Sequence, residues 1–146
     1  MFQRIREWLR RADLRRESGS SSIETAIVFP VMMLLTITII QFGTLVYARQ
    51  SAEEAARYGV RMGVVNVGNP SAGAVAAASD YASKALPWGY HVAVEAPGGV
   101  VGSVLRIRVT TQPPNILGPL MGFFGGGGNG YLITAIAEGR TEGWQP

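Results

Sequence analysis

Two residues near the amino terminus have types and a spacing that could do chemistry: Gly19, and the carboxylate Glu24 five positions later. Glu24 directly precedes a run of 24 residues, Thr25 to Ala48, that has no charged side chain. A carboxylate that enters a bilayer without a partner costs on the order of a few kcal/mol, so Glu24 requires a positive group nearby. A cut after Gly19 would create one, because the new amine of Ser20 would lie about one helical turn from Glu24.

A second interpretation of Glu24 needs no cleavage. The helix macrodipole favours an anion near the start of a helix, and Ser20, Ser21 or Ser22 could cap that start. The two interpretations are compatible with each other. We favour pairing, because a capping role alone would not require the glycine, its spacing and the apolar run to occur together.

The other residues capable of catalysis form no recognisable site. The chain has no cysteine, which excludes thiol chemistry, and His91 is its only histidine. A triad or a zinc site needs further members, so we interpret His91 as structural. An enzyme would need an acid pair from Asp80, Glu95 and Glu138, which nothing in their spacing requires. We therefore expect no catalytic residue, no metal site and no cofactor.

The apolar run that follows Glu24 has the length of a membrane-spanning helix. At about 1.5 Å per residue it reaches roughly 36 Å, enough to cross a hydrocarbon core of about 30 Å. It lacks the polar stripe of a helix buried in a soluble domain. It is also longer than the apolar region of an ordinary secretory signal. Pro30 should kink the helix, which membrane helices tolerate.

The distribution of charge predicts the orientation of this span. Residues 1–19 contain six arginines and three acidic residues, a net charge of +3 that equals that of the whole chain. Arginine-rich short flanks resist translocation, so the amino terminus should stay in the cytoplasm. The remaining residues, 20–146, are neutral overall and have no basic stripe, which argues against nucleic acid as a partner.

Beyond the span the helix should continue as a stalk to about residue 65. Its small residues recur every four positions, a pattern that lets helices approach closely. The rows are Ala48, Ala52 and Ala56, and Ala55, Gly59 and Gly63. This small face packs either on the chain's own sheet or against sister helices. Within the span, Gly43 is a further candidate for helix contact.

Residues 66–146 should form a small α+β domain. An alanine-rich helix is predicted at residues 72–86, with Ser71 as its cap. Segments 91–96, 104–112 and 131–138 alternate between apolar and polar residues, which predicts a three-stranded antiparallel sheet packed on the stalk. In the middle strand, Leu105, Ile107 and Val109 should face the core, and the intervening arginines should face water.

The connection between the second and third strands, residues 113–130, is unusually apolar. Phe123 and Phe124 are among its large side chains. An apolar segment of this size covers the sheet, touches the membrane surface or binds a partner. We expect it to cover the sheet, and we keep the two phenylalanines as candidates for contact with another component.

The amino-terminal pattern resembles the signature of TadE-like pseudopilins of the tight-adherence (Flp/Tad) pilus systems. The resemblance covers about residues 15–65. Its features are Gly19, the serines after it, Glu24, Pro30 in an aliphatic run, Gln41 to Gly43, and the alanine-rich helix that follows. Unlike the small pilin subunits, this chain has Thr25 where they have tyrosine, and it is much longer. Both departures favour a minor subunit over the major filament subunit.

The resemblance implies a non-catalytic minor pseudopilin of the cytoplasmic (inner) membrane, cut after Gly19 by prepilin peptidase and required for assembly of adhesive pili. In such families the acidic residue corresponding to Glu24 pairs with the amine of its own chain or of a neighbouring subunit. The implied partners are the peptidase, other pilins and pseudopilins, the Tad inner-membrane assembly proteins and the lipid bilayer. The implied domains are a leader (1–19), a transmembrane and stalk helix (20–65) and an extracytoplasmic domain (66–146).

An alternative reading keeps the leader on the chain. In that case the protein is an uncleaved, signal-anchored envelope protein, and its outer domain binds a partner through the apolar connection that follows the second strand.

Overall fold

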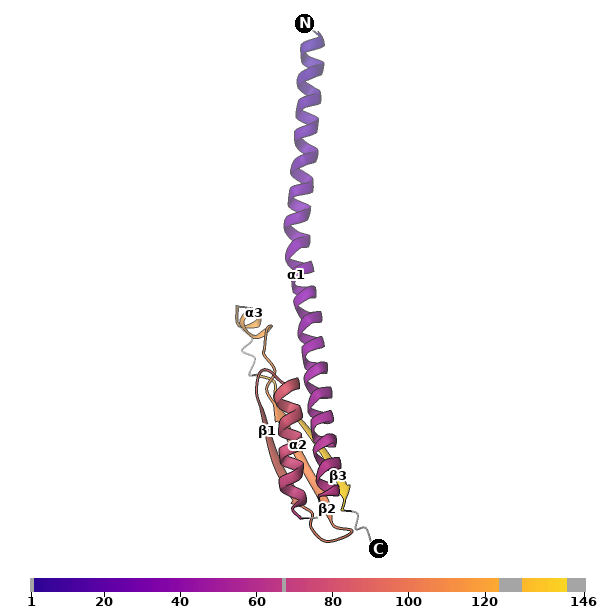
Figure 1. Ribbon diagram of the computed structural model, residues 1–146. Coiled ribbons are helices and arrows are strands. Elements are labelled where there is room, and N and C mark those ends of the chain that lie inside the picture. The colour runs from indigo at the N-terminus through magenta and orange to yellow at the C-terminus, as the bar shows by residue number, and fades with distance from the viewer. Residues whose placement is uncertain (1, 67, 124–129, 142–146) are drawn as a thin grey trace. The chain divides into compact units, whose positions relative to one another are not determined.

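The computed structural model describes residues 2–66, 68–123 and 130–141, with side chains from Ser22 onward except those of Leu120, Met121 and Phe123. In chain order the elements are α1 (Phe2–Val65), α2 (Pro70–Ala85), β1 (Tyr90–Pro97), β2 (Val104–Thr111), α3 (Gly118–Phe123) and β3 (Ile133–Arg140), labelled in Figure 1. The chain divides into two compact units, Met1–Ile39 and Ile40–Pro146.

The first unit contains the amino-terminal part of α1. Pro30 lies inside this helix. The hydroxyls of Thr36 and Thr38 donate hydrogen bonds to the backbone oxygens four residues earlier, each at 2.8 Å. A threonine bonded in this way needs no water for its hydroxyl. The threonines therefore do not interrupt the apolar surface of the helix.

The start of α1 differs from one of the expectations from sequence. The helix begins at Phe2, so Ser20, Ser21 and Ser22 lie inside it. None of them caps a helix start in the uncut chain, because a cap flanks the first helical residue. A cut after Gly19 would place Ser20 at a new start.

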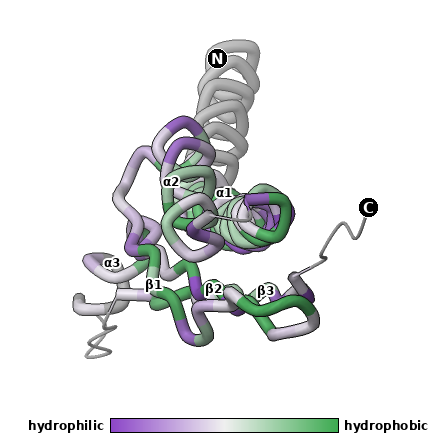
Figure 2. Tube along the Cα trace, turned by 60° about the horizontal axis from the view of Figure 1, so that its bottom comes forward, coloured by the Kyte–Doolittle hydropathy of each residue, from purple (hydrophilic) through white to green (hydrophobic). Residues whose placement is uncertain are grey.

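The second unit has the α+β fold that the sequence predicts. Its antiparallel sheet has the strand order β1-β2-β3, and Figure 2 shows α2 and the carboxyl-terminal part of α1 over one face of it. The register pairs Val92 with Val109 and Val109 with Ala135, which aligns apolar side chains across the three strands. The three predicted strands agree with the observed bounds to within two residues at each end.

The core lies between this face of the sheet and the two helices. Leu105, Ile107 and Val109 are fully buried, as their alternation with arginines predicted. The side chains that meet them from the helices are small. The buried alanines are Ala48, Ala52, Ala55 and Ala56 of α1 and Ala74, Ala78 and Ala82 of α2. The small side chains allow both helices to approach each other and the sheet closely.

The opposite face of the sheet carries charges. Arg106 donates to Glu138 on the neighbouring strand β3, with an Nη2 to Oε2 distance of 2.6 Å. Arg108 pairs in the same way with Glu95 of β1. Exposed ion pairs of this kind contribute at most about 1 kcal/mol each, so they mark the face that meets water more than they stabilise the sheet.

Helix α2 begins differently from the prediction, which placed Ser71 at its cap. Asn69 is the cap: its Oδ1 accepts a hydrogen bond from the N–H of Ala72 at 3.1 Å and another from the Ser71 hydroxyl at 3.0 Å. Pro70 occupies the first turn, where its missing N–H costs nothing. The capping prediction was wrong by two residues because serine and asparagine both suit this position.

Candidate functional site

Glu24 lies on the exposed surface of α1, in the first unit. No described residue forms an ion pair with it. Its apolar neighbours Ile23 and Ile27 are 66% and 65% exposed. Gly19 and Ser20 lie in the same helix, outside the part whose side chains are described. The part of the chain with described side chains therefore supplies Glu24 with no cation.

The apolar surface that begins beside Glu24 extends along α1 without a charge until Arg49. Most of its bulky side chains are exposed, including Phe29, Met33, Ile39 and Phe42. In the described chain this is the helix long and apolar enough to cross a membrane, and the stretch that qualifies it is not buried in the chain's own fold. Helix α1 is therefore a candidate single-pass membrane anchor.

The small residues proposed for helix packing divide into two groups. Ala52 and Ala56 are fully buried in the chain's own core. A Cβ added to Gly59 would lie 2.7 Å from the backbone oxygen of Ala74 and 2.7 Å from the Cβ of Ala78, both in α2. By contrast, a Cβ added to Gly43 would meet nothing within 4 Å. Of the four candidates, only Gly43 is left with its surface open.

Polar contacts also hold α2 against the stalk part of α1. The hydroxyl of Tyr81 donates a hydrogen bond to Oε2 of Glu54. This bond to a carboxylate, helped by burial, raises the pKa of Tyr81 above its usual value. Tyr81 also lies 6.0 Å from Tyr58, measured between ring centroids. Nearer the membrane-spanning part, the Tyr47 hydroxyl donates to the backbone oxygen of Ala85 at 3.1 Å. Together these contacts fix α2 along the stalk.

Gln41 is a functional candidate that sequence reasoning missed. It is only 2% exposed, although it lies within the apolar run. Its Oε1 accepts hydrogen bonds from the N–H groups of Ile116 at 2.7 Å and Leu117 at 3.4 Å. Its Nε2 donates to the backbone oxygen of Pro114 at 3.2 Å. One side chain of α1 thus binds the backbone of the segment that follows β2.

A signal for this contact was present in the sequence. Gln41 is the one amide side chain between Thr25 and Ala48. An amide in an apolar environment needs partners for both its donor and its acceptor, and its own helix backbone cannot satisfy both. The amide predicts a polar contact at that level of the helix, but the sequence alone does not identify the partner.

The apolar connection after β2 is described as far as α3. Phe124 lies outside the described residues, and so does the side chain of Phe123. In the described part Pro113 is buried and Ile116 is 43% exposed. Three hydrogen bonds join this part to Gln41 of α1.

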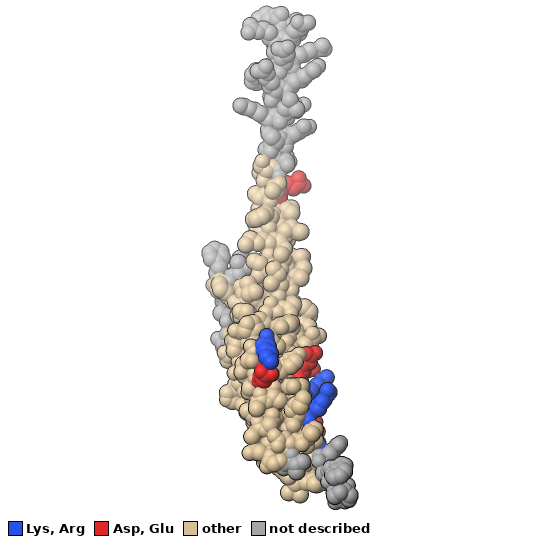
Figure 3. All heavy atoms as spheres, viewed as in Figure 1, with Lys and Arg blue, Asp and Glu red and all other residues tan. Residues whose placement is uncertain are grey.

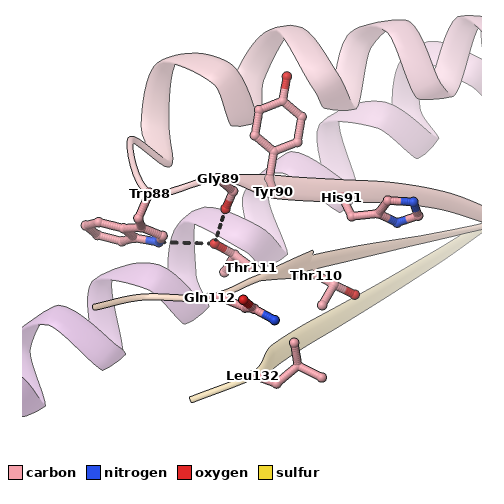
Figure 4. Close-up of a pocket in the computed structure, with 8 residues that line it drawn as sticks. All are labelled: Trp88, Gly89, Tyr90, His91, Thr110, Thr111, Gln112 and Leu132. Atoms are coloured by element: carbon pink, nitrogen blue, oxygen red, sulfur yellow. Dashed lines mark hydrogen bonds between the residues drawn. The ribbon is translucent and has the colours of Figure 1, made fainter. Parts of the chain in front are cut away.

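A hollow of about 250 Å³ lies where β1 begins and β2 ends. Figure 4 shows two hydrogen bonds at its edge: the indole N–H of Trp88 donates to Thr111 Oγ1 at 3.1 Å, and that hydroxyl donates to the Gly89 oxygen at 2.7 Å. His91 lines the hollow, but no carboxylate does. Among the described residues, no group of three or more His, Cys, Asp or Glu side chains could hold a metal ion. The hollow carries no catalytic constellation.

Comparison with known proteins bears on the helix and not on the sheet. Residues 19–61 match the model of a family described as TadE-like protein. The matched segment begins at Gly19 and includes Glu24, Gln41 and Gly59. The resemblance that the sequence indicated is thereby confirmed over this segment. No curated protein and no solved structure matches the chain.

Proposed function

We propose that this chain, whose residues 19–61 match the TadE-like family model, is a non-catalytic minor pseudopilin that takes part in the assembly of Tad pili. The observation that carries the proposal is the position of the match. It starts at the glycine that precedes Glu24 and covers the helix whose apolar surface is exposed. A helix of this kind is suited to lateral packing in lipid.

In this function the chain is inserted once in the inner membrane, with its arginine-rich leader in the cytoplasm and its α+β unit outside. Prepilin peptidase cuts after Gly19 and exposes the amine of Ser20. The glycine suits such a cut, because it lets the backbone of the substrate approach the catalytic groups closely. Other pilins and pseudopilins and the Tad inner-membrane assembly proteins are the partners.

In this function Glu24 sets the relative height of neighbouring helices. The described side chains give it no cation, and a lone carboxylate is costly where the surroundings are apolar. The amine of Ser20, from the same or a neighbouring chain, removes that cost only when the two helices are at the right relative height. A pair of this kind specifies alignment more than it adds stability.

The first test is the intact mass of the membrane-extracted protein from cells with and without the prepilin peptidase. We expect an amino terminus at Ser20 only where the peptidase is present. A Gly19→Leu variant should stay full length because its side chain blocks close approach, whereas a Ser18→Ala variant should still be cut. A full-length wild-type chain in both strains would contradict the proposal and favour the uncleaved, signal-anchored envelope protein.

A further inference from the structure

The backbone bound by Gln41 lies at a particular height along α1. Gln41 follows Glu24 by 17 residues and precedes Arg49 by eight. At about 1.5 Å per residue these separations correspond to roughly 26 Å and 12 Å of helix. The roughly 20 residues needed to cross a bilayer, centred on the charge-free run, extend from about residue 27 to residue 46. Gln41 therefore falls inside the outer part of the span.

Other side chains of α1 at this height also require an apolar environment. Phe42 is 68% exposed and Val46 is 39% exposed, and neither is covered by the chain's own fold. Two sides of the helix thus differ at one height: one presents bare apolar side chains, and the other is covered by residues 114–117. Because the two sides lie at the same height, lipid that surrounds Phe42 and Val46 also borders residues 114–117.

Several backbone N–H groups of this segment either have a partner within the chain or are missing because the residue is proline. Positions 113, 114 and 119 are prolines, which have no N–H. The N–H groups of Ile116 and Leu117 donate to Gln41, and that of Gly118 donates to Asn115 Oδ1 at 2.8 Å. Irregular backbone does not occur exposed to the hydrocarbon region, so such a segment can lie no deeper than its boundary, where fewer unpaired polar groups lower its cost. A loop that faced water would not need this arrangement.

The side chains at this end of the unit have the composition of a membrane interface. Residues 109–137 contain no charged side chain. Tyr47 and Trp88 pack edge to face, with ring centroids 6.1 Å apart, and Tyr90 and Tyr131 are each 38% exposed. Tyrosine and tryptophan are enriched where a protein passes from lipid to water. On the face shown in Figure 3, the charged side chains of the second unit lie below the level of α3.

From these observations we propose a second membrane contact: residues 113–118 of the outer unit lie at the outer boundary of the bilayer, held there by Gln41, with Ile116 facing lipid. The occupant of this surface is the lipid of the outer leaflet. The inference rests on the proposed membrane insertion of α1. It adds that the α+β unit is seated on the membrane and is not held away from it on a free stalk.

The absence of native cysteine allows a direct test on the full-length chain in vesicles. Three single-cysteine variants, Ile116→Cys, Leu34→Cys and Val101→Cys, carry the same environment-sensitive fluorophore. Leu34 lies in the span, and Val101 is 64% exposed on the β1–β2 hairpin, at the other end of the sheet. Each variant is quenched with nitroxide-labelled phospholipid and, separately, with aqueous iodide.

We expect lipid nitroxide to reduce fluorescence at positions 34 and 116 but not at 101, and iodide to reduce it only at 101. Quenching by lipid at 34 together with quenching by iodide at 116 would overturn the inference while leaving the membrane anchor in place. Failure of lipid quenching at 34 would overturn both the anchor and the seating of the outer unit.

Discussion

Two polar side chains of the same apolar helix, Glu24 and Gln41, differ in burial and in hydrogen bonding. Glu24 is exposed and has no ion-pair partner among the described residues, whereas Gln41 is buried with its donor and acceptor both used. A polar group in apolar surroundings is costly unless it is satisfied. Gln41 is satisfied within its own chain, whereas the proposed function meets the cost of Glu24 with the amine that cleavage creates, in the same or another subunit.

The first prediction concerns Glu24. We expect Glu24→Ala to leave membrane insertion and the stability of the second unit unchanged, since no described contact is lost. The same change should abolish assembly, because the amine of Ser20 loses its partner. Glu24→Asp keeps the charge and serves as the control, with partial assembly. The measurements are membrane fractionation and the yield of surface pili, and normal piliation by Glu24→Ala would contradict the pairing.

The second prediction concerns Gln41. Replacement by leucine leaves the N–H groups of Ile116 and Leu117 without an acceptor, at a cost of about 1–3 kcal/mol for an unsatisfied buried group. Amide hydrogen exchange at these two positions should accelerate, and denaturant unfolding of the full chain in micelles should shift to lower concentration. Thr38→Val is the matched control, because its hydroxyl bonds only its own helix. Unchanged exchange in Gln41→Leu would show that the segment is held by other contacts.

At the scale of elements, α1 is one helix with two kinds of surface. Up to about Val46 most of its bulky apolar side chains are exposed, and from Ala48 its small side chains are buried against α2 and the sheet. The small face of the stalk is therefore occupied within the chain and is not open to sister helices. Under the proposed function, lateral packing with other subunits uses the exposed apolar part, where a Cβ added to Gly43 would meet nothing within 4 Å.

The third prediction compares two glycines of this helix. Gly59→Ala places a methyl group 2.7 Å from the Ala74 oxygen, so the helices must separate, and we expect a loss of about 1–3 kcal/mol of unfolding free energy. Gly43→Ala meets nothing and should be neutral or stabilising by about 0.5–1 kcal/mol through helix propensity.

Denaturant unfolding of both variants in micelles measures the difference. Equal stabilities would contradict the close packing of α1 on α2. Gly43→Leu adds a separate readout: pilus yield should fall while stability stays unchanged, if sister helices meet at this position.

At the scale of the whole molecule, positive charge is concentrated on one side of the apolar run in the sequence. Residues 1–19 contain six of the thirteen basic residues, whereas Arg49, Lys84, Arg106 and Arg108 of the second unit form ion pairs with carboxylates of that unit. Because positive flanks close to a span determine which end is retained, the topology that we propose depends mainly on residues 1–19.

The fourth prediction is the resulting topology, tested in cells that lack the peptidase so that the leader is kept. A cysteine at Val101 should react with a membrane-impermeant maleimide in intact spheroplasts, and a cysteine at Ser18 should react only after lysis. Both variants have a single thiol, because the native chain has no cysteine. Labelling of Ser18→Cys before lysis would contradict the cytoplasmic leader.

The sequence by itself determined the parts of this protein that depend on local pattern. The apolar run of α1, the alternation of Leu105, Ile107 and Val109 in β2, and the order Gly19, Glu24, helix are all periodic or adjacent features. They predicted the candidate membrane anchor, the sheet and the match of residues 19–61 to the TadE-like family model. The sequence was less decisive at the start of α2, because asparagine and serine both suit a helix cap. Asn69 rather than Ser71 caps this helix.

The tertiary structure alone decided which distant residues meet. Gln41 and Ile116 are separated by 75 positions, and neither residue type identifies the other as its partner. The packing of Gly59 on Ala78 was equally open, because a small-residue row fits the chain's own helix as well as a neighbour's. Contacts of this kind follow from the way the sheet returns the chain to α1, which is a property of the whole fold and not of any single segment.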